Sequence, residues 1–297
     1  MGQYNLNDYN LWTALVTPLK KDLTVDWDSL KSLVKEQEEA SNALLILGST
    51  GEALNIGLET RKKIIEFVID LSPKVPIMAG VGGHNLEEQK NWVSWLETKS
   101  IDAYLMVVPI YAKPGAQGQY HWFKSLMDKV SRPVMLYNVP GRTGKELEVS
   151  ALENLKDHTN FWALKEASGD VNKFKAYLKA SGNGKVYCGD DGLFPSFADA
   201  GSCGLVSVAS NTWPKQTALY VRKSLDKSLE EAKMWEAAAN SLFIASNPVP
   251  AKRLLKLEHR ISSDALMPPL SSMDLDSNTD ILAANTNVNE WFKKYSN

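Results

Sequence analysis

Short runs of apolar residues alternate with longer amphipathic stretches along most of the chain. The apolar runs are continuous, which is the pattern of strands in a parallel sheet whose two faces are both covered. Between them, stretches such as residues 58–71 repeat apolar positions with helical spacing, as Ile64, Ile65, Val68 and Leu71 do on one face. The predicted strands are residues 11–19, 43–48, 75–82, 103–109, 133–140, 161–168, 185–191 and 204–210.

Eight strand–helix units within residues 1–225 predict a (β/α)8 TIM barrel. A doubly wound α/β sheet is the competing architecture, but it usually has fewer strands and a phosphate-binding fingerprint at its first turn. Residues 226–297 keep helical periodicity and show no further strand pattern. We therefore expect a barrel over residues 1–225 that carries the active site, and a C-terminal helical region over residues 226–297 that packs on it.

Composition narrows the classes of function. The 297 residues include 33 Lys and Arg against 35 Asp and Glu, a formal net charge of -2. Because proteins that bind nucleic acid through its phosphates carry a basic excess, no nucleic-acid partner is expected. No apolar run reaches the ~18 residues of a membrane-spanning helix, and the first residues lack the apolar segment of a signal peptide. Two cysteines cannot build a disulfide framework, so we expect a cytoplasmic protein with no membrane partner.

The chain offers no complete motif for a cofactor or a metal ion. Residues 80–85 (GVGGHN) carry Asn85 where a dinucleotide fingerprint needs its third glycine, and they follow the third predicted strand. The four histidines lie far apart and in no metal-ligand spacing. We therefore expect no cofactor and no metal, and catalysis by side chains alone.

Lys165 is the most informative polar residue, since it interrupts the apolar strand predicted at residues 161–168. The active site of a TIM barrel lies at the carboxyl ends of its strands, where Lys165 falls. Strand alternation sends Lys165 and Glu166 to opposite faces, one toward the barrel interior and one toward the helices. Burial lowers the pKa of an ammonium from about 10.4, where about one amine in two thousand is neutral at pH 7. A value of about 7–8 would make Lys165 a Schiff-base nucleophile. A lysine that reaches solvent or pairs with a carboxylate is the alternative.

Neighbouring strand ends supply further chemical groups. Tyr137 is expected within reach of Lys165, where it could shuttle the proton that imine formation needs, unless it only caps the barrel. Ser49 and Thr50 lie in the turn GSTGE, which suits a small carboxylate, although an ordinary Ser/Thr turn has the same sequence. Arg142 follows in PGRTG, where its guanidinium suits a second carboxylate and a surface arginine is the alternative. All of these residues are expected at the same carboxyl-terminal end of the barrel, which favours an active site there.

The sequence resembles the pyruvate-dependent class I aldolase superfamily, and within it the dihydrodipicolinate synthase family. The resemblance rests on LGSTGEA (47–53), VVPIYAKP (107–114), LYNVPGRTG (136–144), LKEASGD (164–170) and CGDD (188–191), and extends to NPVPAKRLL (247–255). It implies a (β/α)8 barrel with a C-terminal helical region, assembled as a homotetramer from two tight dimers. The implied reaction is a lyase-type condensation of pyruvate, held as a lysine Schiff base, with aspartate 4-semialdehyde in the diaminopimelate pathway to lysine.

The resemblance also implies roles for individual residues. Lys165 would form the Schiff base with pyruvate, and Tyr137 would donate and accept protons. Ser49 would link Tyr137 to Tyr111, which the adjacent subunit would supply. The substrate-binding residues would be Thr50, Gly189 and Val206 around pyruvate, and Arg142 at the carboxylate of the aldehyde.

The pair Ser49-Thr50 leaves a second enzyme open. The synthases usually carry two threonines there, and Ser-Thr is common in the N-acetylneuraminate lyase branch. Arg142 argues for the synthase, because the lyases generally lack it. The alternative enzyme is an N-acetylneuraminate lyase or a 2-keto-3-deoxy sugar acid aldolase with the same Lys165 imine. A catalytically silent barrel that senses a small carboxylate is the non-enzymatic alternative, and the intact Lys165, Tyr137 and Tyr111 disfavour it.

Many synthases of this family are inhibited by lysine, and the resemblance allows a prediction of whether this protein is. The positions that match their lysine pocket are Leu58, Arg61, His84 and Ile110, and only Glu88 keeps the family type. Leu58 and Ile110 offer no hydrogen bond to a zwitterion, and Arg61 adds positive charge where an amine would lie. We therefore expect millimolar lysine to leave the activity nearly unchanged.

Overall fold

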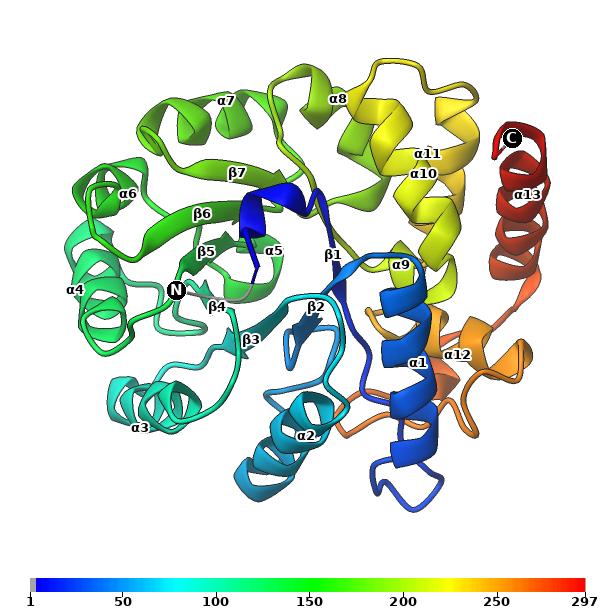
Figure 1. The fold of residues 1–297 in the computed structure, drawn as a ribbon, viewed down its shortest axis with the longest axis horizontal. Coiled ribbons are helices and arrows are strands. Elements are labelled where there is room, and N and C mark those ends of the chain that lie inside the picture. The colour runs from blue at the N-terminus through cyan, green and yellow to red at the C-terminus, as the bar shows by residue number, and fades with distance from the viewer. Residues whose placement is uncertain (1–3, 297) are drawn as a thin grey trace.

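The computed structural model describes residues 4–296. Residues 1–3, which begin the N-terminal stretch without a predicted signal segment, and residue 297 lie outside the described residues. Parallel strands close into a barrel in sequence order from β1 to β8 (Figure 1), which confirms the predicted TIM barrel. The strands are β1 (Leu11–Ala14), β2 (Ala43–Ile46), β3 (Ile77–Val81), β4 (Ala103–Val107), β5 (Val134–Asn138), β6 (Phe161–Glu166), β7 (Lys185–Cys188) and β8 (Leu205–Ser207).

Every predicted strand contains an observed one but extends too far at its carboxyl end. The first prediction, residues 11–19, continues past Ala14, where β1 ends. Leu15, Val16 and Leu19 are nevertheless buried, because they pack into the larger cluster of apolar side chains. An apolar run marks burial, and by itself it does not separate a buried strand from the buried loop that follows.

Helices surround the barrel and cover the outer faces of its strands (Figure 1). In α2 (Leu58–Asp70), Ile64, Ile65 and Val68 are buried against the barrel, as the periodicity predicts. The other helices up to residue 225 are α1 (Trp27–Glu39), α3 (Leu86–Glu97), α4 (Ala116–Met127), α5 (Pro140–Thr143), α6 (Val149–Leu155), α7 (Val171–Ala180), α8 (Phe194–Asp199), α9 (Ala209–Thr212) and α10 (Pro214–Leu225).

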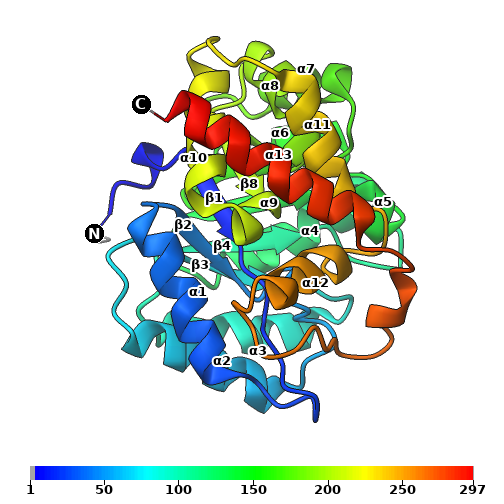
Figure 2. The same ribbon diagram turned by 90° about the vertical axis from the view of Figure 1, so that its right-hand side faces the viewer.

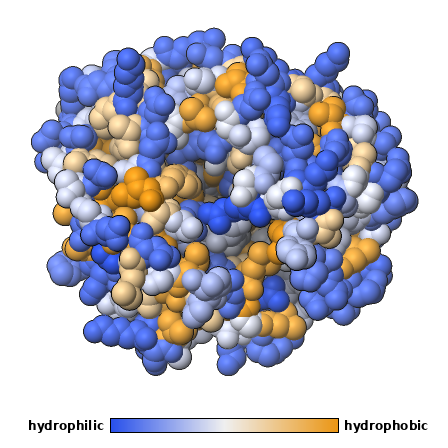
Figure 3. Space-filling view, turned by 180° about the vertical axis from the view of Figure 1, so that it is seen from behind, coloured by the Kyte–Doolittle hydropathy of each residue, from blue (hydrophilic) through white to orange (hydrophobic). Residues whose placement is uncertain are grey.

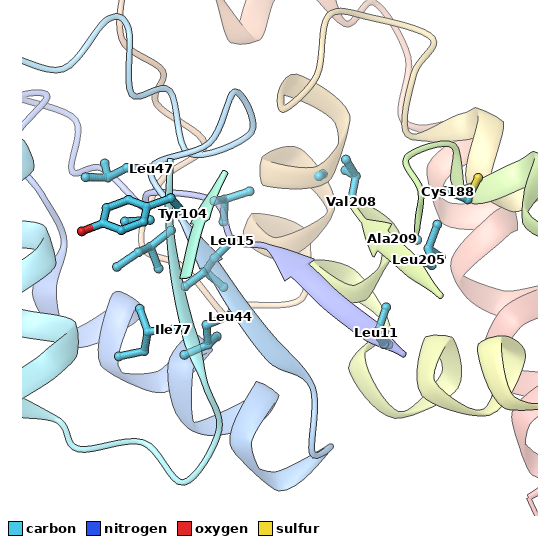
Figure 4. Packing of buried hydrophobic residues seen from close by; sticks show 14 of the residues in the cluster. Leu11, Leu15, Leu44, Leu47, Ile77, Tyr104, Cys188, Leu205, Val208 and Ala209 are labelled. Carbon is cyan, nitrogen blue, oxygen red and sulfur yellow. The ribbon is translucent and has the colours of Figure 1, made fainter. Parts of the chain in front are cut away.

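Two groups of buried apolar side chains hold these layers together. The larger lies between the strands and the helices, and Figure 4 shows Leu44, Ile77 and Tyr104 within it. The smaller fills the barrel interior, where Trp12 and Trp162 pack with ring centroids 5.8 Å apart. Both tryptophans are the second residue of their strands, so they occupy the amino-terminal half of the barrel. The polar residues of the interior therefore lie at its carboxyl-terminal end.

The chain after residue 225 adds helices only, within the part that the structure describes. They are α11 (Ala232–Ser241), α12 (Val249–Leu257), the short 3-10 helix η3 (Ser272–Asp274) and α13 (Thr279–Tyr295). Figure 2 shows α13 crossing α10 and α11, with α12 below them. This confirms the predicted C-terminal helical extension, while its separation as a domain at residue 225 stays a prediction. No helix among residues 4–296 is both long enough and apolar enough to cross a membrane.

The short helix η1 (Leu6–Asp8) identifies the two ends of the barrel. It leads into the start of β1 and lies in front of the barrel in Figure 1. The opposite face therefore holds the carboxyl ends of the strands. Figure 3 views that face and shows it hollowed near its middle. This is the face on which a TIM barrel carries its active site.

Candidate active site

Lys165 and Tyr137 lie side by side inside the barrel. β5 and β6 pair with Tyr137 opposite Lys165, and Asn138 opposite Glu166. Lys165 Nζ lies 4.5 Å from the centroid of the Tyr137 ring. The Lys165 residue is only 5% exposed, which removes the alternative of a lysine that reaches solvent. The predicted proximity of the two residues is thus what the strand register produces.

Burial sets the proton affinity of both groups. It lowers the pKa of Lys165 to about 8, although the nearby charges of Asp191 and Asp190 oppose the shift. At that pKa about one amine in ten is neutral at pH 7, about two hundred times the fraction of an ordinary lysine. Burial also raises the pKa of Tyr137 above its ordinary value, so its phenol keeps its proton at neutral pH. A partly neutral amine and a protonated phenol therefore lie next to each other.

Thr50 and Arg142 are joined through Asn247. The side chain of Thr50 is buried, and its Oγ1 accepts a hydrogen bond from Asn247 Nδ2 at 2.9 Å. Arg142 Nη2 donates to the backbone carbonyl of Asn247 at 3.3 Å. Sequence reasoning did not single out Asn247, although the residue opens the segment NPVPAKRLL on which the resemblance ends. One residue of the C-terminal region thus contacts both predicted carboxylate-binding side chains.

Gly189 gives Lys165 the room that it needs. A Cβ atom at this position would lie 2.7 Å from Lys165 Cε and 2.7 Å from the Cβ of Ala167. Any larger residue would therefore displace the lysine. Val206, in the middle of β8, is fully buried among the apolar side chains of the barrel interior.

Two carboxyl groups, those of Asp190 and Asp191, follow β7. Their negative charges oppose the lowering of the Lys165 pKa by burial. Burial raises the pKa of Asp190 to about 6, with the charge of Lys165 opposing the shift. Asp191 is held by the backbone N–H groups of Val208 and Ala209, at 3.0 and 3.2 Å. Both carboxyl groups belong to the segment CGDD, of which only Gly189 is a predicted site residue.

Ser49 and Tyr137 line one small open cavity with a volume of about 40 Å³. Gly82, Val107 and Arg61 also line it. Tyr111 stays outside this group, because its side chain is 90% exposed. The fold of one chain therefore brings together Lys165, Tyr137 and Ser49, and it does not bring Tyr111 to them.

Metal-binding clusters and reactive thiols are the remaining kinds of site to consider among the described residues. Among residues 4–296 no three His, Cys, Asp or Glu side chains are grouped so that they could hold a metal ion. Cys188 and Cys203 are both free thiols. Burial raises the pKa of the Cys188 thiol well above its ordinary value, so this thiol is a poor nucleophile.

Comparison with known sequences gives the family. A model described as the dihydrodipicolinate synthetase family matches residues 8–287. The chain is 45% identical over 284 residues to a 4-hydroxy-tetrahydrodipicolinate synthase of Francisella tularensis subsp. novicida, covering 95% of this chain and 96% of that protein. It is 40% identical over 282 residues to a 4-hydroxy-tetrahydrodipicolinate synthase of Wolbachia pipientis subsp. Culex pipiens, covering 95% and 96%.

Solved structures agree with the sequences. The dihydrodipicolinate synthase of Acinetobacter baumannii, complexed with pyruvate, matches with a TM-score of 0.88 and 31% identity, covering 95% of this chain and 99% of that one. The enzyme of Cyanidioschyzon merolae, with lysine bound, matches with a TM-score of 0.89 and 27% identity, covering 95% and 99%. These relatives confirm the predicted barrel and the predicted lyase-type synthase. The chain belongs to the dihydrodipicolinate synthetase family.

Proposed function

We propose that the protein is a 4-hydroxy-tetrahydrodipicolinate synthase in which Lys165 forms the Schiff base with pyruvate. The enzyme condenses this imine with aspartate 4-semialdehyde in the diaminopimelate pathway to lysine. The observation that carries the assignment of Lys165 is its burial beside Tyr137, which lowers its pKa to about 8. An amine of this kind attacks a ketone at neutral pH, as class I aldolase chemistry requires.

The order of bonds follows from these groups. The neutral amine of Lys165 attacks C2 of pyruvate, and the hydroxyl of the carbinolamine leaves as water after Tyr137 passes it a proton. Loss of a proton from C3 of the imine gives an enamine, whose C3 attacks the aldehyde carbon of the second substrate. The amino group of that substrate then attacks the imine carbon, which closes the ring and releases Lys165. Ser49, beside Tyr137 in the cavity, would carry the protons onward.

Two carboxylate sites would orient the substrates. Thr50 would bind the carboxylate of pyruvate, with Gly189 and Val206 beside it, and Arg142 would bind the carboxylate of aspartate semialdehyde. Asn247 supports this pairing, because it hydrogen-bonds to both Thr50 and Arg142 and so keeps the two sites at a constant separation. A guanidinium suits the second carboxylate because its planar fork matches the two oxygens.

The exposed Tyr111 supports an oligomer. We infer a tight dimer in which the partner subunit's Tyr111 reaches Ser49 and completes the proton relay, and two such dimers would form the homotetramer. Leu54 and Leu58 are large apolar residues exposed on the same chain, and Leu54 lines the cavity that Ser49 and Tyr137 share. Burial of these leucines would favour association. The free thiols support a reducing compartment, for which we propose the cytoplasm.

Trapping and assay together test this function. Borohydride added with pyruvate should leave one reduced adduct per subunit, on Lys165, and Lys165→Ala should abolish it along with turnover. Lys173→Ala is the matched control, because Lys173 is a solvent-accessible lysine on α7 that pairs with Glu146. An adduct on another lysine, or none, would overturn the role of Lys165. Cleavage of N-acetylneuraminate or a 2-keto-3-deoxy sugar acid, without condensation of aspartate semialdehyde, would favour the alternative enzyme.

A further inference from the structure

A fully buried ion pair joins the turn after β2 to the C-terminal helical region. Lys252 Nζ on α12 lies 2.5 Å from Glu52 Oε1, and both side chains are 0% exposed. Lys252 Nζ also donates to the carbonyl of Ala265 at 2.7 Å, and Glu52 Oε2 accepts from the N–H of Met267 at 2.7 Å. The pair therefore connects the turn to α12 and to the segment after it, whose contacting residues lie at least 200 positions further along the sequence.

The stability of the fold does not by itself explain why the ion pair between Glu52 and Lys252 is present. Burial lowers the pKa of Lys252, and the charge of Glu52, the hydrogen bond to it and, to a smaller extent, the charge of Asp264 oppose the shift. The desolvation of two buried charges cancels much of their attraction, so apolar residues of similar size often stabilise a fold as well. The ion pair also fixes the distance and direction between the two segments that it joins. An apolar contact does not do this.

The turn that Glu52 ends is the one that carries Ser49 and Thr50. The N–H of Glu52 donates to the carbonyl of Ser49 at 3.1 Å and closes the turn. Glu52 has a φ of 57°, in the left-handed region that residues with a side chain seldom occupy. Such a conformation persists only where its surroundings hold it. On the other side of the turn, Thr17 Oγ1 donates to the carbonyl of Gly51 at 2.8 Å.

The start of α12 holds this turn at two points. Asn247, two residues before the helix, donates to Thr50 Oγ1 at 2.9 Å. Lys252, whose N–H donates to the carbonyl of Pro248 at 2.9 Å in the first turn of the helix, holds Glu52. The hydroxyl proposed for the pyruvate carboxylate thus lies between two contacts that both come from the C-terminal region.

We propose that Glu52 and Lys252 are positioning residues for pyruvate, and that through them the C-terminal helical region is part of the active site. Their ion pair keeps the turn in the conformation that aims Thr50 at the carboxylate of pyruvate while C2 faces Lys165. The inference rests on the proposed function, because its effect is measured on imine formation at Lys165.

The test compares Glu52→Gln, Lys252→Met and the double variant Glu52→Gln/Lys252→Met. The double variant leaves no unpaired buried charge, and it keeps an acceptor for the N–H of Met267, so it should fold even where a single variant does not. Arg253→Met is the matched control. Arg253 is the next residue of α12, and its Nε bonds Asp264 Oδ2 at 2.5 Å, in the same segment that Lys252 contacts, without touching the turn.

The measurement is the pyruvate concentration that gives half of the maximal borohydride-trapped adduct on Lys165. We expect the double variant to raise this concentration by about tenfold or more, equivalent to about 1.4 kcal/mol. The adduct at saturating pyruvate should still reach one per subunit, and the KM for aspartate semialdehyde should change by less than about threefold. Arg253→Met should leave the pyruvate concentration within about twofold of the wild-type value.

Three outcomes would count against the proposal. A folded double variant with the wild-type pyruvate concentration would show that the pair does not position the turn. An equal rise in Arg253→Met would show a general effect of α12 packing. An equal rise in the KM of both substrates would also contradict it, because Glu52 ends the pyruvate turn only. A wild-type protein that forms no adduct at all would instead remove the proposed role of Lys165, which separates the two failures.

Discussion

Asn138 and Glu166 form a hydrogen-bonded pair on the outer side of the same two strands that carry Tyr137 and Lys165 on the inner side. Asn138 Nδ2 lies 2.8 Å from Glu166 Oε1, and both residues are fully buried. Asn138 Oδ1 in turn accepts from the N–H of Leu147 at 2.8 Å. The pair therefore locks the register that sets the nucleophile beside its proton donor.

Asn138→Ala should lower the stability of the fold. It leaves the Leu147 N–H without a partner and removes one of the two donors to Glu166 Oε1, the other being the N–H of Ser168. A buried unsatisfied polar group costs about 1–3 kcal/mol. Denaturant unfolding measures the loss, and kcat should fall with it because the Tyr137–Lys165 register loosens. Asn172→Ala, at an exposed position of α7, is the control. Equal stability of the two variants would contradict the role of the pair.

The rate of imine formation should rise with pH through the pKa of Lys165. Only the neutral amine attacks, so at subsaturating pyruvate the rate should climb up to tenfold per unit below about pH 8 and level off above it. Asp190→Asn should move the midpoint lower, because it removes a negative charge that stabilises the ammonium. Single-turnover rates between about pH 6 and about pH 9.5 measure both. A rate that still climbs at the upper limit would mean an unshifted lysine.

Arg142→Ala should weaken one substrate and spare the other. Loss of a charge-assisted bidentate contact should raise the KM for aspartate semialdehyde by about thirtyfold, or about 2 kcal/mol, while the pyruvate adduct on Lys165 persists. Arg142→Lys keeps the charge but loses the planar fork, so its KM for aspartate semialdehyde should lie between those of the wild type and Arg142→Ala. Steady-state kinetics with each substrate varied in turn is the measurement. Equal damage to both substrates would make Arg142 structural.

Tyr111→Phe should reduce turnover sharply and leave the fold intact, whereas Tyr120→Phe, on α4, should not. Mixing Lys165→Ala and Tyr111→Phe chains tests where the tyrosine acts. If the partner subunit's Tyr111 serves each site, a mixed dimer regains one complete site, so activity should recover to about a quarter of wild type in a random mixture. Two inactive variants that stay inactive after mixing would place the tyrosine in its own chain.

Lysine should not inhibit the enzyme at millimolar concentration. The Arg61 guanidinium lies 5.1 Å from the centroid of the Trp92 ring and lines the cavity that Ser49 and Tyr137 share. Burial lowers the pKa of Arg61, and the charge of Glu88 opposes the shift. A cation at this point repels the ammonium groups of lysine. Initial rates with added lysine measure the effect, and half-inhibition below about 1 mM, a binding free energy near −4 kcal/mol, would contradict the prediction.

The sequence by itself determined the barrel and singled out Lys165 as the candidate nucleophile. Eight continuous apolar runs separated by helical patterns specify a covered parallel sheet, because burial on both faces leaves no polar position in a strand. Lys165 stands out against that rule, and alternation along the strand sends it and Glu166 to opposite faces. Both inferences depend on spacing over a few residues, which is local information.

Only the tertiary structure decided how the site is held. Asn247 lies 197 positions from Thr50, and Lys252 lies 200 positions from Glu52. No periodicity reports such contacts, because they depend on how the C-terminal helices pack against the barrel. The ends of the strands and the pKa of Lys165 were likewise decided there. Both follow from how much chain covers a group and which charges remain near it, and these are properties of the packed molecule.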